Sequence, residues 1–244
     1  DVVTVRRAHD QFLINNLRTQ VATGEHFSAM DSSLYEIEQI LGSVDNDHLG
    51  NAITAFFSSW HDLAQPTSDE SIKSLVVGSA ETLITDMHSI SSSLDDLEDM
   101  INEQVEEEIA SLNSLLTQVG DLNSQIMAAE VGGHAANDLR DRRDALVTDI
   151  SAIAAVTAEE RDDGSMDLIL NGRTMITRDS VQQFTTRMVE DDDGYHVEIL
   201  TSGTYHDVDL PAGRLRGLLE SRDEVVTDVR EQLDEVAANL ITAV

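Results

Sequence analysis

The stretch NDLRDRRDALVTDIS, residues 137–151, places three arginines, Arg140, Arg142 and Arg143, within four positions. Clustered guanidinium groups are suited to bind phosphate or carboxylate groups, or to hold a buried joint together. The rest of the chain repels anionic partners, because 47 acidic residues face only 15 lysines and arginines and the formal net charge is −32. Neither nucleic acid nor an anionic membrane is therefore an expected partner.

Other chemistry-bearing residues do not assemble into a recognisable site. If Gly194 of EDDDG (190–194) took the sixth place of a calcium loop, Val189 and Leu200 would stand where Asp and Glu are needed. The eight histidines lack zinc-binding spacings, and the chain has no cysteine. The serines at 89 and 91–93 have no recognisable base beside them. We expect no metal, no cofactor and no catalysis.

The position of the arginines on their helix favours a structural role. After Asn137, which can cap the helix, the inward positions are Leu139, Arg143, Leu146, Ile150 and Ile153. Arg143 should therefore be buried, with a hydrogen-bonding partner from another segment, because Asp141 and Asp144 are not at facing positions. Glu130, across a turn at Gly132-Gly133, is a candidate partner. Arg140 and Arg142 should be solvated.

Long helices must position this stretch. Apolar periodicity predicts helices over about 5–41 (Phe27, Met30, Leu34, Ile37, Leu41) and 49–63. Thr67 and Glu70 resemble a capping box that starts a third helix, which runs to about 131 unless Gly78 or Gly120 interrupts it. Its heptads continue after a stutter, and the eight acids of 95–108 belong to its outer faces. Residues 138–154 should lie antiparallel against 114–130.

The period then changes from 3.6 to 2. Strands are expected at 165–170, 173–177, 181–189, 195–200 and 204–210, with Asn171-Gly172 as a two-residue hairpin turn. One last helix should follow Pro211, with Leu215, Leu219, Val226, Val229, Leu233, Val236 and Leu240 along one side. The prediction is an α+β, mainly α protein: an elongated antiparallel helical or coiled-coil rod (1–155 and 211–244) with an inserted small antiparallel β domain (156–210).

Four stretches resemble one protein family. Asn137, Leu139, Asp141, Arg143, Asp144, Leu146 and Val147 match N-x-L-x-D-x-R-D-x-L-V. RRAHDQFLINNLR (6–18), the segment 56–83 and GRLRGLLESRDEVVTDVREQLDEVAANL (213–240) also follow the family's order, with His9 where an aromatic residue is usual. The whole pattern resembles the bacterial flagellar hook-associated protein 1 family, the hook–filament junction proteins, and the chain looks like a central fragment that lacks both terminal regions.

The resemblance implies a structural axial component of the flagellum that connects hook to filament, without catalysis or cofactor. It implies export through the flagellar type III apparatus and an extracellular location. It also implies a ring of copies that contacts the hook protein and the second junction protein, and an export chaperone that binds outside this fragment. A helical sensor ectodomain, a surface adhesin and a phage tail component remain alternatives from other classes.

Overall fold

The computed structural model of the chain describes residues 11–42, 48–65, 70–131, 135–191 and 194–243. The helices within these ranges are α1 (Gln11–Leu41), α2 (His48–Leu63), α3 (Glu70–Glu130), α4 (Asn137–Ile153), α5 (Arg214–Glu220), the π-helix η1 (Ser221–Val226) and α6 (Thr227–Ala243). The strands are β1 (Thr157–Glu160), β2 (Met166–Leu170), β3 (Arg173–Thr177), β4 (Ser180–Val181), β5 (Phe184–Asp191) and β6 (Gly194–Thr201).

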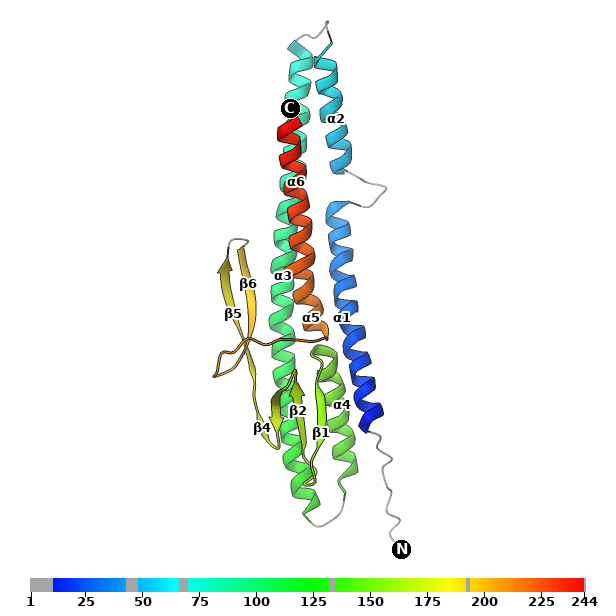
Figure 1. Cartoon of the computed structure of the whole chain (residues 1–244), viewed down its shortest axis with the longest axis vertical. Coiled ribbons are helices and arrows are strands. Elements are labelled where there is room, and N and C mark those ends of the chain that lie inside the picture. Colours follow the sequence, from blue (N-terminus) through cyan, green and yellow to red (C-terminus); the bar gives the residue numbers. More distant parts are fainter. Residues whose placement is uncertain (1–10, 43–47, 66–69, 132–134, 192–193, 244) are drawn as a thin grey trace. The chain divides into compact units, whose positions relative to one another are not determined.

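The predicted fold class is confirmed, since the chain is mainly helical and a small antiparallel β region lies between α4 and α5 (Figure 1). By its internal contacts the chain divides into two compact units, Asp1–Asp31 with Ile101–Glu220, and Ser32–Met100 with Ser221–Val244. The boundaries between these units lie within α1 and within α3. The division by structural type, into helical 1–155 and 211–244 and β-rich 156–210, stays a prediction.

Helix α3 is continuous over 61 residues, and neither Gly78 nor Gly120 interrupts it. Its buried apolar side chains keep the expected heptads and the stutter: Val76, Leu83, Ile90, Leu94, Leu97, Ile101, Val105, Ile109, Leu112, Leu116, Val119 and Ile126. Burial of this seam, more than intrinsic propensity, stabilises so long a helix. Within the described part of the chain, no helix is both long and apolar enough to cross a membrane.

Helix α4 runs back beside the end of α3 (Figure 1), and the proposed turn at Gly132-Gly133 lies outside the described residues. Arg140 near the start of α4 contacts Glu130, while Arg143 one turn later contacts Asn123. As the residue numbers rise along α4, the residues that they contact on α3 have lower numbers. The two helices are therefore antiparallel, as predicted. Val147, Ile150 and Ile153 complete the buried side of α4.

The β region consists of two antiparallel sheets, one of four strands in the order β1-β2-β3-β4 and one hairpin, β5-β6. The predicted turn between β2 and β3 is confirmed, because Leu170 pairs with Arg173 across Asn171 and Gly172, whose φ angles are 45° and 79°. Positive φ at both positions is the signature of a type I′ turn.

Three strand predictions were wrong. The strand expected at 181–189 is divided between β4 and β5, which belong to different sheets. The sequence pattern missed β1, a four-residue strand in which Ala158 is buried and two acids follow it. The predicted strand at 204–210 forms only one isolated bridge, between Leu200 and Asp207. Here the chain bends sharply at Tyr205, which has φ of 52° and donates its backbone N–H to the Thr201 carbonyl oxygen. Beyond the bend, the backbone N–H of Thr201 donates to the His206 carbonyl oxygen and that of Val208 to the Ile199 carbonyl oxygen, so the contact with β6 covers only residues 206–208.

The apolar stripe proposed for the first helix was also largely wrong. Phe27, Leu34 and Leu41 are 61%, 46% and 38% exposed, and only Ile37 of that stripe is fully buried. The buried side of α1 includes the polar residues Arg18 and Ser33 as well as Ala22. A hydrophobic pattern could not select this side, because part of it is polar.

The last helix is not one regular helix. A π-helical segment, η1, separates α5 from α6 and shifts the face that follows it. Of the predicted positions, Leu215, Val226 and Leu233 are buried, and in α5 Leu218 is buried in place of Leu219. Within the second unit, Phe56 of α2, Leu83 of α3 and Ala52 form a small core.

Candidate functional site

Arg143 lies at the centre of a buried polar network in the first unit. Its side chain is 0% exposed. Nη1 donates to Oδ1 of Asn123 at 3.0 Å and to the Gly164 carbonyl oxygen at 2.7 Å, and Nη2 donates to Oε1 of Glu160 at 2.8 Å. Burial lowers the pKa of Arg143, whereas the hydrogen bond to Glu160 raises it. The predicted burial is confirmed.

The expected partner of Arg143 was wrong. Glu130 binds Arg140 instead, with Nε to Oε1 at 2.8 Å and Nη2 to Oε2 at 2.7 Å. This paired geometry is the strong form of an arginine–carboxylate contact. Arg140 also binds Glu160, which therefore bridges both arginines. Arg140, predicted to be solvated, is half-buried inside the network, whereas Arg142 is exposed as expected.

The charges at the rim of the network stabilise one another. The hydrogen bond from Arg140 lowers the pKa of Glu130, and the backbone N–H of Ala136 and the charge of Arg143 act in the same direction against burial. The hydrogen bond to Glu130 likewise raises the pKa of Arg140. Both groups are thus ionised at neutral pH.

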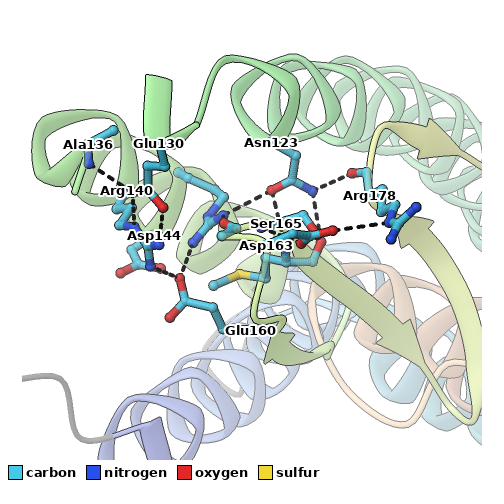
Figure 2. Close-up of polar contacts among 12 residues, drawn as sticks. Asn123, Glu130, Ala136, Arg140, Asp144, Glu160, Asp163, Ser165 and Arg178 are labelled. Atoms are coloured by element: carbon cyan, nitrogen blue, oxygen red, sulfur yellow. Dashed lines mark hydrogen bonds and ion pairs between the residues drawn. The ribbon is translucent and has the colours of Figure 1, made fainter. Parts of the chain in front are cut away.

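Asn123, which projects from α3 between the arginine and the sheet, joins them (Figure 2). Its Oδ1 accepts from Arg143 and from the backbone N–H of Met166 at 3.1 Å, and its Nδ2 donates to the carbonyl oxygens of Met166 and Arg178. The amide thereby uses two donors and two acceptor positions while it is 0% exposed. One side chain therefore fixes α3, α4, β2 and the end of β3.

The turn between β1 and β2 completes the site. Gly164 has φ of +84°, and a Cβ there would lie 2.6 Å from Oε2 of Glu130. Glycine is needed at this position because other residues rarely adopt this positive φ and because a Cβ would clash with Glu130. Beside it, Asp163 accepts from the Ser165 hydroxyl and backbone N–H and pairs with Arg178, and the Ser165 hydrogen bonds lower the pKa of Asp163 (Figure 2).

Asp144 and Asn137 lie at the edge of this network. Asp144 contacts the buried guanidinium of Arg18 from α1, with 3.3 Å between Oδ1 and Nη2. Asn137 is the first residue of α4 and is not its cap, because the N-cap position belongs to Ala136, which has no side-chain cap. Instead, Oε1 of Glu130 accepts the backbone N–H of Ala136 at 2.8 Å. A carboxylate is favourable at this end of a helix.

Two further asparagines of α3 hold the β5-β6 hairpin in the same way. Asn113 accepts the backbone N–H of Phe184 at 2.8 Å and donates to its carbonyl oxygen at 2.9 Å. Asn102 accepts from Val197 at 3.1 Å and donates to Tyr195 at 3.2 Å. These amides replace a missing neighbour strand, because each supplies a donor and an acceptor to a strand edge.

Asn171 and Glu70, two other residues predicted to be structural, make contacts of their own. Asn171 of the hairpin turn donates its side-chain amide to Oδ2 of Asp209 at 2.8 Å. Glu70 is the first residue of α3 and pairs with Lys73 at 3.1 Å. Thr67, its proposed capping partner, lies outside the described residues. Among the described residues, no group of three or more His, Asp or Glu side chains is arranged to hold a metal ion.

Sequence reasoning missed Asn123, Glu160, Gly164 and Arg18. A signal existed for Asn123, which falls on the apolar seam of α3 four residues after Val119. A polar residue at a seam position usually has a specific buried partner. The other three carry no such signal, since their role depends on which segments the fold brings together.

Fold and site together define a mainly helical protein, in which a buried arginine network joins a helical hairpin to an inserted β region. Residues 34–244 match the family described as the flagellar hook-associated protein FlgK helical domain, and the chain belongs to this family.

Known relatives agree with this assignment. Flagellar hook-associated protein 1 of Salmonella typhimurium is 24% identical over 96% of this chain and 43% of its own length. The Bacillus subtilis protein of that name is 28% identical over 63% of this chain and 30% of its own length. The flagellar hook junction protein FlgK of Burkholderia pseudomallei has the same fold, with a TM-score of 0.81, 23% identity and coverage of 90% of this chain and 41% of its own. The chain spans less than half the length of these relatives.

Proposed function

We propose that this chain is the central part of a structural protein of the bacterial flagellum, which connects the hook to the filament as a junction ring. The observation that carries the proposal is the family match over residues 34–244, in line with a relative described as a hook junction protein. The polar groups around Arg143 favour the same reading, because they bind one another and leave little capacity for a substrate. Catalysis and a cofactor have no part in this role.

The partners follow from the role. Copies of the protein form the ring, and the hook protein and the second junction protein of the flagellum lie on its two sides. An export chaperone would bind outside this fragment during passage through the flagellar type III apparatus. The mature protein is then extracellular.

Within the ring, the continuous helix α3 would resist bending and contact neighbouring copies, while the β region would act as an outward spacer. The contacts of Asn102, Asn113 and Asn123 and the Arg143 network support these two roles, since they fix the β region firmly to α3. A junction transmits torque only if its domains do not slide on one another.

Immunogold electron microscopy tests the location. Antibodies against this fragment should label intact flagella in a narrow band where the hook meets the filament, and a strain without the gene should lack attached filaments. Label along the whole filament, or normal filaments in the deletion strain, would refute the proposal.

Charge reversal on the outer face of α3 in the full-length protein tests the contacts between copies. We expect weakened filament attachment and reduced swimming for variants with exposed acids replaced by lysine, for example Glu106→Lys. Normal swimming in all such variants would rule out α3 as the contact element and leave the location of the protein unaffected.

A further inference from the structure

The middle of α3 carries a line of unpaired carboxylates. Asp99, Glu103 and Glu107 follow one another at intervals of four residues, and all three are exposed. Among the described residues, none of these side chains has an ion pair or a hydrogen bond, although both ends of the same acidic stretch do. Like charges four residues apart on a helix repel each other and destabilise it.

The chain supplies cations only to the ends of this stretch. Arg230 of α6 pairs with Asp95 at 2.7 Å and with Glu98 at 2.9 Å. Arg214 of α5 binds Glu108 at 2.8 Å. With one lysine in the whole sequence and acids in threefold excess, the middle of the stretch is left uncompensated.

We propose that dissolved salt takes the place of the missing cations, so that full stability of α3 depends on ionic strength. The inference goes beyond the proposed function and does not depend on it. Cations gather diffusely along Asp99, Glu103 and Glu107, and no bound-ion site is involved, because successive carboxylates stand roughly 6 Å apart along the helix and do not converge.

Screening acts differently on the repelling carboxylates of α3 and on the buried pairs around Arg143. The pairs around Arg143 are buried, and buried pairs are screened much less than exposed ones. Raising the salt concentration should therefore remove the repulsion along α3 while leaving the arginine network intact. Exposed ion pairs such as Arg187–Glu198 are weakened by salt but contribute little to stability, so the net effect of salt on stability is positive.

Thermal unfolding of the 244-residue chain, followed by helical circular dichroism, tests this. Sodium chloride raised from about 0.1 M to about 1 M shortens the screening length from roughly 10 Å to about 3 Å. The Tm should rise by on the order of 5 °C, given several relieved repulsions in a chain of this size. An unchanged or falling Tm would overturn the proposal.

A matched pair of variants separates local repulsion from total charge. Asp99→Asn/Glu103→Gln/Glu107→Gln should raise Tm at low salt and flatten its dependence on salt. Glu36→Gln/Glu38→Gln/Glu81→Gln removes the same number of exposed charges, and none of these residues has an acid three or four positions away. This control should keep the wild-type slope. Equal slopes in both variants would refute a special role for the line on α3.

The identity of the cation distinguishes screening from binding. Tetramethylammonium chloride should raise the wild-type Tm about as much as sodium chloride does at equal concentration, because screening depends on charge and not on coordination. A rise with sodium alone would mean a specific ion site and would overturn the diffuse mechanism.

Discussion

The guanidinium of Arg143 and the side-chain amide of Asn123 meet at 3.0 Å with no exposed surface on either residue. Their contact ties α4 to β2, because the same Oδ1 of Asn123 also accepts the backbone N–H of Met166. A buried cation is thus held by a neutral amide on one side and by the carboxylate of Glu160 on the other. The joint between helices and sheet consequently depends on a few side chains, and each can be tested.

Asn123→Ala should lower the free energy of unfolding by about 2–4 kcal/mol, because it leaves several buried donors and acceptors unpaired. Asn123→Asp should be comparably harmful, since a carboxylate cannot donate to the carbonyl oxygens of Met166 and Arg178. Urea denaturation measures both. The exposed Asn239→Ala on α6 is the control and should change stability by less than about 0.5 kcal/mol. Equal effects of Asn123→Ala and Asn239→Ala would contradict the role assigned to Asn123.

Arg143→Ala should cost about 3–5 kcal/mol, because it removes the buried partner of Glu160, Asn123 and the Gly164 carbonyl oxygen at once. Arg143→Met keeps much of the volume and should be less harmful. Arg142→Ala is the matched control, one position away and exposed, with an expected change within about 0.5 kcal/mol. Thermal unfolding of the three variants suffices, and similar Tm values for the Arg142 and Arg143 alanine variants would contradict the network.

Periodicity and turn chemistry predicted most of the architecture. The seam of α3, the α3–α4 hairpin and the Asn171-Gly172 turn are local or repetitive signals, which survive in a single sequence. The burial of Arg143 could also be predicted, because this residue occupies an inward position on an otherwise apolar helix face. The failures of helix prediction came where the buried side of α1 was partly polar and where a π-helix changed the phase of the last helix.

The partners in the site could not be predicted in the same way. Glu130 and Glu160 are both acids within reach of the α4 arginines. Only the path of β1 places Glu160, and not Glu130, in hydrogen-bonding contact with Arg143. Asn102 and Asn113 interact with strand edges far away in the sequence, and a polar residue on a helix gives no sign of which backbone it will bind. Long-range register, which these contacts depend on, is a property of the fold and not of any local window.

The Glu130–Arg140 pair predicts a pH dependence. The pKa of Glu130 in the folded state lies below its ordinary value of 4.5. Its ionised form therefore stabilises the fold above that value, and the stabilisation is lost as the pH falls through the lowered pKa. Glu130→Gln should reduce stability by about 1 kcal/mol at neutral pH, a size typical of a partly exposed ion pair.

The difference between Glu130→Gln and the wild type should shrink towards zero in acid, when the carboxyl of Glu130 is protonated in both states. Chemical denaturation at a series of pH values measures it. Glu38→Gln on the exposed side of α1 is the control for a change of net charge. A Glu130→Gln deficit that stays constant down to strongly acidic pH would show that packing, and not charge, causes it.

Gly164 and Gly172 offer the clearest matched comparison, because both have positive φ, +84° and +79°, but only Gly164 is crowded. Gly172→Ala should cost about 1–2 kcal/mol from the left-handed backbone alone. Gly164→Ala adds a Cβ that would lie 2.6 Å from Oε2 of Glu130 and 3.1 Å from Nη2 of Arg140, so the pair must shift. We expect the Gly164 variant to be less stable than the Gly172 variant by at least about 1 kcal/mol in urea denaturation.

In the double variant Gly164→Ala/Glu130→Ala, the truncated side chain makes room for the new Cβ, so the two losses should be less than additive. Strict additivity would mean that Glu130 does not limit the space at Gly164.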